Sequence, residues 1–383
     1  MARLDEICRL NMGQSPDSSS YNEIGEGIPF FQGNADFGEV FPTVRVWCNA
    51  PTKIAYPGDI LISVRAPIGA LNIADVKCCI GRGLAALTVD ESICSKQYLW
   101  YAIANKVEEL NSKGTGSTFK AISKSILSET EIPLPPLDEQ RRIAAILDKV
   151  TGLIALRKQQ LAKLDELVKA RFVEMFGEPV TNPMGWPVHR LSEYIIFLTS
   201  GSRGWSKYFT DAGEIFITIK NVKDCKINLN DVQYVTPPQN AEAKRTKVQE
   251  GDLLISITAD LGRTGVVSKE IAKCGGYINQ HLTCIRLQKE ILHPLYIAYY
   301  MESEAGKRQF HRKNQAGVKA GLNFDSIKSL TIALPPIEVQ NSFVSYVSQI
   351  DRQMLTIRQG LDILKMLQKS MMQDYFESRG DGK

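Results

Sequence analysis

The stretch Leu134-Pro135-Pro136-Leu137-Asp138-Glu139-Gln140 decides the fold, because it occurs twice in the chain. It returns as Leu334-Pro335-Pro336-Ile337-Glu338-Val339-Gln340, at an offset of 200 residues. The offset holds without a gap as far as Phe176 and Phe376. A repeat with so long a period indicates two domains rather than a solenoid of short units.

A second pair of matching segments lies upstream of the first. Pro57-Gly58-Asp59-Ile60-Leu61-Ile62-Ser63 returns as Glu250-Gly251-Asp252-Leu253-Leu254-Ile255-Ser256, here at an offset of 193. Because the two offsets differ, the segments between the matching stretches differ in length between the two halves. Each half therefore consists of a variable region followed by a constant one. The repeats predict a first domain over 1–136, a central spacer helix over 137–177, a second domain over 178–336, a C-terminal spacer helix over 337–377 and a flexible tail over 378–383.

The two constant regions carry apolar residues on two heptad lines. Pro135 and Pro136 cannot continue a strand, and the acidic Asp138 and Glu338 suit the start of a helix. Such a narrow apolar stripe favours a coiled-coil seam over two separate amphipathic helices. The predicted seam residues are Ile143, Leu147, Val150, Ile154, Leu161, Leu164 and Val168 in the first helix, and Phe343, Val347, Ile350, Met354, Ile357, Leu361 and Leu364 in the second.

The variable regions have the pattern of mixed α/β domains, so the sequence predicts an α+β fold. Apolar, β-branched runs predict strands at 60–64, 84–89, 215–219, 253–257 and 282–287. Apolar residues at helical spacing predict one helix over 97–110 and another over 294–308.

Composition places the chain among globular proteins. The 383 residues include 44% hydrophobic and 23% charged residues, with a net charge of +4. Residues 178–336 are the most basic, with 20 Lys and Arg against 15 Asp and Glu. The sequence has no apolar run long enough to span a membrane and no secretory signal. The eight Cys are scattered without a CxxC pair, which predicts free, mostly buried thiols and a cytoplasmic location.

Several catalytic signatures are missing from the sequence. There is no GxxxxGK[ST] loop for ATP. No Pro-Pro pair follows Asp or Asn and precedes an aromatic residue, as a DNA amino-methyltransferase requires, and the zinc deaminase pattern is missing too. We therefore expect a binding protein without catalytic residues, metal ligands or a cofactor of its own.

Polar loops that carry isolated basic residues recur in both halves. Arg matches the hydrogen-bonding edge of guanine and Asn or Gln that of adenine, while Lys, Ser and Thr suit phosphate. Ordinary surface turns have a similar composition, but recurrence in both halves favours DNA binding. The candidate DNA-binding residues are Gln14, Ser15, Gln32, Asn34, Arg65, Arg82, Lys113, Thr115, Ser117, Lys120, Ser202, Arg203, Lys220, Asn221, Thr258, Arg263, Gln280, His281, Lys313, Gln315, Lys319 and Asn323.

This arrangement resembles the specificity subunit of type I restriction–modification systems. The duplicated Pro-Gly-Asp-Ile-Leu-Ile-Ser stretch and the Leu-Pro-Pro…Gln helix start carry the resemblance, which covers nearly the whole chain. The second copy departs from the first at Val339 and Asn341, where the first has Glu139 and Arg141. This difference puts identical partner contacts at the two helix starts in doubt.

The resemblance implies two target-recognition domains joined by two helices in an antiparallel coiled coil, with pseudo-twofold symmetry. Such a chain would read a bipartite site in double-stranded DNA. It would also scaffold two methyltransferase subunits that bind S-adenosylmethionine and methylate adenine, and a motor-nuclease subunit could join them. Two alternatives stay open at this point: a coiled-coil adaptor that binds only proteins, and a single-chain restriction–methylation enzyme.

Overall fold

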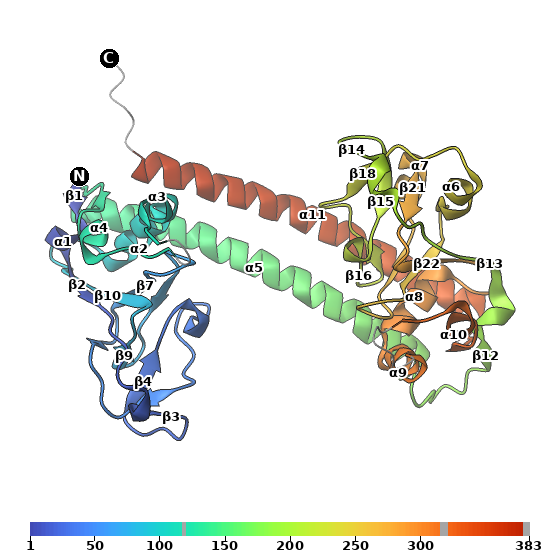
Figure 1. Ribbon diagram of the computed structural model, residues 1–383, viewed down its shortest axis with the longest axis horizontal. Helices are drawn as coiled ribbons and strands as arrows, with labels where there is room; N and C mark the ends of the chain where they lie inside the picture. The colour runs from blue at the N-terminus through green and yellow to red at the C-terminus, as the bar shows by residue number, and fades with distance from the viewer. Residues whose placement is uncertain (117–119, 315–320, 378–383) are drawn as a thin grey trace, which may run out of the picture. The chain divides into compact units, whose positions relative to one another are not determined.

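The computed structural model describes residues 1–116, 120–314 and 321–377, and the predicted tail over 378–383 lies outside them. It contains two compact units (Figure 1). Unit 1 comprises Met1–Gln159 and Ile357–Lys383, and unit 2 comprises Gln160–Thr356. Each long helix is divided between the units, so the packing units do not end where the sequence repeats end.

Unit 1 consists of short strands and helices. Its helices are α1 (Leu4–Ile7), α2 (Lys96–Asn105), α3 (Val107–Lys113), α4 (Lys124–Ser128), the first part of α5 (Leu137–Phe176) and the last part of α11 (Ile337–Phe376), and its 3-10 turns are η1 (Ser18–Ser20) and η2 (Asn34–Asp36). Its strands are β1 (Ala2–Arg3), β2 (Cys8–Met12), β3 (Tyr21–Asn22), β4 (Ile28–Phe31), β5 (Trp47–Cys48), β6 (Ile54–Ala55), β7 (Ile60–Ser63), β8 (Leu71–Ile73), β9 (Cys78–Ile80), β10 (Leu84–Val89) and β11 (Glu131–Ile132).

The sheets of unit 1 divide it into layers. A four-stranded antiparallel sheet has the order β2-β10-β7-β8, and a five-stranded sheet has the order β3-β5-β4-β9-β6. In the second sheet β4 and β9 are parallel. The four-stranded sheet lies between helices α2 to α4 and the five-stranded sheet (Figure 1).

Unit 2 is built from the same kinds of element. Its helices are the last part of α5, α6 (Ala241–Thr246), α7 (Lys269–Cys274), α8 (Pro294–Glu302), α9 (Glu304–Lys313), α10 (Phe324–Lys328) and the first part of α11, and its 3-10 turns are η3 (Leu191–Tyr194), η4 (Trp205–Tyr208) and η5 (Ile219–Asn221). Its strands are β12 (Val188–Arg190), β13 (Ile195–Ser200), β14 (Phe209–Thr210), β15 (Glu214–Ile217), β16 (Val222–Lys223), β17 (Lys226–Ile227), β18 (Gln233–Val235), β19 (Leu253–Ser256), β20 (Thr264–Val266), β21 (Gly276–Ile278), β22 (Leu282–Leu287) and β23 (Thr331–Ala333).

The topology of unit 2 repeats that of unit 1. Its sheet β13-β22-β19-β20 follows the order of β2-β10-β7-β8, and its β12–β23 pair matches β1–β11. A second sheet, β14-β18-β15-β21, again contains one parallel pair, β15 with β21. The duplication seen in the sequence is therefore a duplication of a whole domain, with inserted strands that differ between the copies.

The central strands are apolar along their whole length because their sheet is covered on both faces. In β7, Ile60 and Ile62 belong to the core under the helices, whereas Leu61 belongs to the core on the other face. In β19, Leu253 and Ile255 face the helices and Leu254 faces away from them. Side chains alternate between the faces of a strand, so two buried faces require a continuous apolar run.

The predicted helices over 97–110 and 294–308 were wrong in one respect, because each is two helices. The first breaks at Lys106, between α2 and α3, and the second at Ser303, between α8 and α9. At Ser303 the backbone is extended, with ψ at 169°. The Ser303 hydroxyl donates to the Tyr300 carbonyl at 2.6 Å, and that carbonyl also accepts a bond from Ser303 N at 3.3 Å, so Ser303 caps the end of α8. The predicted strands and the ends of α5 and α11 agree with the structure.

The repeated glutamine of the Leu-Pro-Pro motif is buried in both units. Gln340 Nε2 donates to the carbonyls of Ile291 and Pro335 at 3.0 and 2.9 Å, and its Oε1 accepts from His293 N at 2.8 Å. Gln140 makes the corresponding bonds to Ile93, Pro135 and Ser95. One amide thus ties the helix start to two loops, which explains why the motif keeps its glutamine.

We expect Gln340→Ala to lower the free energy of unfolding by about 2–4 kcal/mol, because buried backbone groups lose their partners. Chemical denaturation of the chain measures the change. Gln349→Ala is the matched control, since Gln349 lies exposed on the same helix. A change of equal size in the two variants would contradict this role of Gln340.

The Gly-Asp turns before β7 and β19 are structural. Asp59 accepts a hydrogen bond from Tyr56 N, and Asp252 accepts one from Gln249 N, both at 2.8 Å. Asp252 is fully buried and also accepts two hydrogen bonds from Arg286, which raise the pKa of that guanidinium. These carboxylates accept hydrogen bonds within their own domains.

The predicted seam residues are buried or half-buried. Ile143, Leu147, Val150, Ile154, Val168, Phe343, Val347, Ile350, Met354 and Leu361 are buried, and Leu161, Leu164, Ile357 and Leu364 are half-buried. In unit 1, Gln368 Nε2 donates to Thr151 Oγ1 at 2.8 Å. In unit 2, the rings of Phe172 and Phe343 lie 5.3 Å apart. In each unit, therefore, the start of one long helix contacts the end of the other.

The cysteines are free thiols, and all but Cys274 are buried, as the sequence predicted. Burial raises the pKa of Cys8, Cys78 and Cys94 to about 12, which keeps these thiols protonated at neutral pH. Within the described ranges, no group of His, Cys, Asp and Glu could hold a metal ion. No helix among those residues is long and apolar enough to cross a membrane.

Candidate nucleic-acid interface

Matched backbone hydrogen bonds gather polar loops at one place in each unit. After β2, Gly13 N donates to Leu84 O at 2.9 Å and Gln14 N to Ile80 O at 3.0 Å. After β13, Gly201 N donates to Leu282 O at 3.1 Å and Ser202 N to Ile278 O at 2.9 Å. The first loop is therefore held in the same way in both copies.

The loops that follow β4 and β15 join the same place. Gly81 N donates to Phe31 O at 2.8 Å, and Asn279 N donates to Ile217 O at 3.1 Å. The loops that follow β7 and β19 complete it, since Val64 N donates to Gly83 O at 2.9 Å and Ile257 N to His281 O at 3.0 Å. We call residues 13–15, 31–34, 64–66 and 81–83 the loop cluster of unit 1, and residues 201–203, 217–220, 257–259 and 279–281 the loop cluster of unit 2.

These bonds also define which positions correspond. Gly83 and His281 occupy the same place in the network, so Arg82 corresponds to Gln280. Arg65 and Thr258, which follow Val64 and Ile257, correspond in the same way. The two clusters thus share a backbone and differ in their side chains.

Close backbone contact explains the glycine at the first loop. A Cβ atom on Gly13 would lie 2.1 Å from Gly81 O, and one on Gly201 would lie 2.1 Å from Asn279 O. Neither distance is compatible with a side chain. Glycine therefore lets the first loop pack directly on the 81–83 or 279–281 loop.

Unit 1 places several predicted residues around one cavity of about 210 Å³. Its lining includes Ser15, Gln32, Asn34, Arg65 and Arg82. Both arginines are exposed, and neither forms an ion pair with any residue that the structure describes. Two guanidinium groups that face solvent beside amide side chains form a surface suited to base edges and phosphate.

Asp36 shapes this surface, although the sequence analysis did not select it. Its carboxylate accepts hydrogen bonds from Gln32 N at 2.7 Å and Gly33 N at 3.3 Å, and it pairs with Arg45 at 2.6 Å. The series Gly33-Asn34-Ala35-Asp36 is a turn signal, because Asn and Asp side chains can bond to nearby backbone N–H groups. That signal was present in the sequence.

The other predicted residues of unit 1 lie at the edge of the cluster or apart from it. Gln14 and Lys120 are exposed. Thr115 pairs through its backbone with Ala121, and Lys113 forms an ion pair with Glu109 at 2.6 Å. Ala66 N donates to Lys120 O at 3.0 Å, which brings that segment beside Arg65. Ser117 lies outside the described residues.

In unit 2, three of the predicted residues form a hydrogen-bonded chain. His281 Nδ1 lies 2.6 Å from Thr258 Oγ1, and His281 Nε2 lies 3.0 Å from Gln280 Nε2. All three side chains are half-buried. His281 therefore uses both ring nitrogens in contacts within unit 2.

Two predicted contacts in unit 2 need correction. Ser202 is 1% exposed and its hydroxyl lies 3.2 Å from Thr246 Oγ1. Asn221 is 3% exposed, and its side chain accepts from Thr218 N and donates to Asn228 O. Both side chains are buried and form hydrogen bonds within unit 2, so they stabilise loops and do not face a ligand. The sequence pattern could not separate a buried polar side chain from an exposed one.

Some of the remaining predicted residues of unit 2 are exposed, and others bond to neighbouring residues of the same unit. Arg203 and Lys220 are exposed. Arg263 pairs with Asp260, and Lys313 donates to Ser329 Oγ at 2.8 Å. Asn323 caps α10 by accepting from Ser326 N at 2.8 Å. Gln315 and Lys319 lie outside the described residues.

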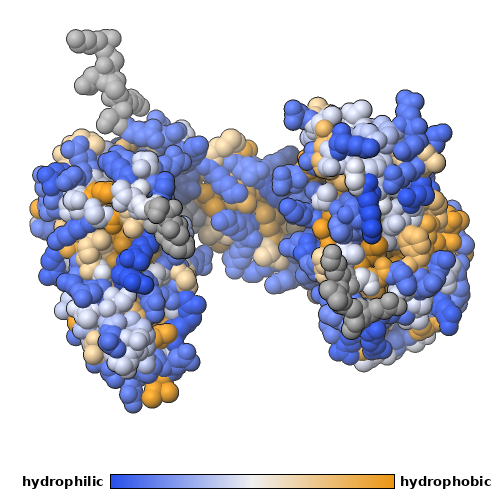
Figure 2. Space-filling model, viewed as in Figure 1, coloured by the Kyte–Doolittle hydropathy of each residue, from blue (hydrophilic) through white to orange (hydrophobic). Residues whose placement is uncertain are grey.

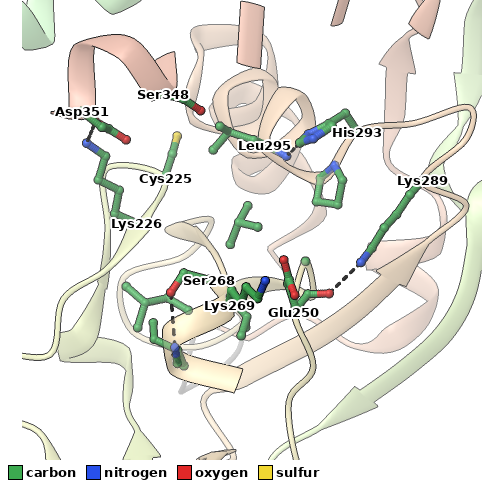
Figure 3. Close-up of a pocket in the computed structure, with 16 residues that line it drawn as sticks. Cys225, Lys226, Glu250, Ser268, Lys269, Lys289, His293, Leu295, Ser348 and Asp351 are labelled. Carbon is green, nitrogen blue, oxygen red and sulfur yellow. Dashed lines mark hydrogen bonds and ion pairs between the residues drawn. The ribbon is translucent and has the colours of Figure 1, made fainter. Parts of the chain in front are cut away.

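A larger cavity of unit 2, of about 610 Å³, involves none of the predicted contact residues. Figure 3 shows two of its lysines bonded to neighbours, with Lys226 paired to Asp351 and Lys289 donating to the main-chain carbonyl of Glu250 at 2.6 Å. His293 also lines it, and burial lowers the pKa of that imidazole. The cavity lies in the repeated scaffold, between the turn before β19 and helix α11.

A family model and the similar proteins point to the same family. The family model described as "Type I restriction modification DNA specificity domain" matches residues 1–166 and 207–365. A Methanocaldococcus jannaschii protein assigned as the specificity subunit of a type I restriction enzyme, MjaX, is 42% identical over 165 residues, which are 43% of this chain and 39% of that protein. The type I restriction enzyme EcoBI specificity subunit of Escherichia coli is 21% identical over 91% of this chain and 78% of its own length.

A solved structure shares the fold. The S subunit of the type I restriction–modification system of M. genitalium aligns with a TM-score of 0.56 at 14% identity, over 98% of this chain and 95% of that chain. The match with the M. jannaschii protein spans well under two thirds of that relative, whereas the match with the E. coli protein spans most of it. The likeness in fold thus extends over both units.

Proposed function

Because this chain belongs to the family of type I restriction–modification DNA specificity domains, we propose that it is the non-catalytic specificity subunit of such a complex. It reads a bipartite site in double-stranded DNA, one half-site with each unit. One observation carries this function: matched backbone bonds build the same loop cluster in both units, with different side chains on each. A shared frame with different side chains suits two unlike half-sites.

The two long helices form an antiparallel coiled coil that relates the units by pseudo-twofold symmetry and fixes the half-site spacing. Support comes from the buried seam residues and from contacts that pair the start of each helix with the end of the other, such as Thr151 with Gln368 and Phe172 with Phe343. A long paired helix resists bending, so it suits a spacer.

The chain scaffolds two adenine methyltransferase subunits, which bind S-adenosylmethionine, and a motor-nuclease subunit can join the complex. This chain holds no cofactor itself. Its role is to position the methyltransferase subunits on the DNA. Binding combines salt-dependent phosphate contacts with groove readout, and the small net charge of +4 suggests that partner subunits supply much of the affinity.

Genome-wide mapping of methylated adenine, in cells with and without this chain beside its methyltransferase partner, tests the function. We expect a two-part motif with unlike halves that disappears without the chain. Methylation by the purified chain alone, with labelled methyl donor, would favour the single-chain enzyme instead. Absence of any DNA footprint with the partner present would favour the protein-binding adaptor.

Exposed apolar side chains on the long helices give the partner a docking surface, and Figure 2 shows apolar side chains along these helices. In unit 1, Leu153 and Leu156 of α5 and Ile363, Met366 and Leu367 of α11 are 46% to 64% exposed. When the seam residues are placed at heptad positions a and d, four of these five residues fall at positions c and g, which are neighbours on one side of a helix. In an antiparallel pair the g positions of the two helices lie on the same side, so these residues form one surface. An apolar surface of this kind is typical of a site covered by a partner.

We expect the pair Leu156→Glu and Ile363→Glu to weaken association with the methyltransferase subunit by at least about tenfold, because a charge would be buried in the interface. Co-purification and light scattering measure it. Leu229→Glu, at an exposed site in a loop, is the matched control. Unchanged association of the double variant would place the methyltransferase elsewhere on the chain.

A further inference from the structure

The loop cluster of unit 2 contains an amide that its neighbours hold in one orientation. Gln280 Nε2 lies 3.0 Å from His281 Nε2. An amide nitrogen can only donate, so this ring nitrogen must accept. The ring proton then resides on Nδ1 and is donated to Thr258 Oγ1, 2.6 Å away.

The backbone of this segment is fixed as well. Ile257 N donates to His281 O at 3.0 Å, Gln280 N donates to Ser202 O at 3.1 Å, and His281 N donates to Asn279 Oδ1 at 3.2 Å. The imidazole stands where unit 1 has Gly83, because both residues accept the same backbone bond. The histidine is therefore an addition of unit 2 that braces the neighbouring glutamine.

The brace leaves the recognition edge of the amide free. Gln280 uses one N–H toward His281, and no hydrogen bond to its Oε1 or its second N–H occurs among the residues that the structure describes. One free acceptor beside one free N–H is the pattern that pairs with adenine in the major groove, where N6 donates and N7 accepts. Arg82, at the corresponding position of unit 1, carries donors alone and matches guanine.

From this geometry we infer that Gln280 reads an adenine in the half-site of unit 2, and that His281 and Thr258 are positioning residues that fix the order of its donor and acceptor. The inference rests on the proposed function, since it names the base recognised by one of its two readers. The corresponding place in unit 1 reads guanine through Arg82, so exchanging these two residue types exchanges the preferred base.

The test uses the chain in complex with its methyltransferase partner and DNA duplexes that carry the mapped site. Each adenine of the unit 2 half-site is replaced in turn by 7-deazaadenine, which lacks the N7 acceptor. We expect one position at which this replacement weakens binding of the unaltered complex by about 5- to 150-fold, because an amide N–H left without its acceptor costs about 1–3 kcal/mol. The complex with Gln280→Ala should not respond to the replacement at that position and should respond normally at the others.

Three further variants sharpen the test. Gln280→Glu keeps the size of the side chain and removes the N–H, so it should lose the same discrimination while folding normally. Gln280→Arg should shift preference at that position to a G·C pair. His281→Ala should reduce discrimination at that position alone, whereas a purely structural role would weaken all positions together.

Gln239→Ala is the matched control, because Gln239 is exposed elsewhere in unit 2. Sequence-specific binding in which Gln280→Ala weakens every duplex equally would overturn the inference and leave the proposed function standing. Binding by the unaltered complex without any sequence preference would overturn both.

Discussion

Replacement of Arg65 and Arg82 together by alanine is expected to abolish recognition of the half-site read by unit 1. Both side chains are exposed at the same cavity of about 210 Å³ and are without ion pairs among the described residues. A bidentate contact of arginine with guanine contributes about 1–3 kcal/mol of discrimination. Two such contacts amount to about 2–6 kcal/mol, or about 30-fold to more than 10,000-fold in specific binding.

Competition binding of the complex, with duplexes altered in one half-site at a time, measures this loss. Arg3→Ala with Arg9→Ala is the matched control, because both residues are exposed in unit 1 and the change of charge is the same. Recognition of the other half-site should persist in both double variants. A uniform loss across all sequences, together with a reduced salt slope, would instead show that the two arginines contact phosphate.

A second large effect is expected from lengthening both long helices by one heptad. The insertions belong between Gln159 and Gln160 in α5 and between Thr356 and Ile357 in α11, where the chain passes from one unit to the other. Seven residues add about 10 Å of helix, which corresponds to about 3 base pairs of DNA. Methylation at the original sites should fall by on the order of 100-fold or more, because one half-site is no longer reached.

The lengthened chain should methylate sites with the same two half-sites and a longer spacer, and methylation mapping would reveal them. Replacement of the exposed Ala155, Lys158 and Gln159 by other helix-forming residues, which leaves the helix length, the seam and the exposed leucines unchanged, is the control, and it should keep the original spacing. A changed half-site with an unchanged spacer would contradict the division of the chain into readers and spacer. Loss of folding would be visible beforehand in a thermal melt.

The long helices and the repeated strands were the most predictable features of this protein. The ends of α5 and α11, the strands that surround the Gly-Asp turns and the burial of the seam follow from periodicity and from two repeated motifs. Short-range breaks were not predictable in the same way. The helix break at Ser303 consists of one residue with an extended backbone whose N–H and hydroxyl cap α8, and apolar spacing does not detect it.

Among the candidate site residues, side-chain type indicated which loops matter but not which residues face outward. Arg65 and Arg82 are exposed at one cavity, whereas Ser202 and Asn221 are buried and bonded within unit 2. Ser, Asn and Gln serve equally well as ligands for the protein backbone and for a base. Only packing decides between these uses, because a buried polar group must find its partner inside the fold.

The sequence by itself determined the duplication, the two long helices and the lack of the ATP-loop, amino-methyltransferase and zinc-deaminase signatures, because each is a property of residue order along the chain. The tertiary structure decided which loops meet, which position of one unit corresponds to which in the other, and how His281 orients Gln280. The contact of His281 with Gln280 joins neighbouring side chains, whereas the meeting of the loops and the correspondence of positions depend on backbone hydrogen bonds between segments far apart in sequence. Such bonds join N–H and C=O groups that every residue except proline carries, so they leave no signal in residue type.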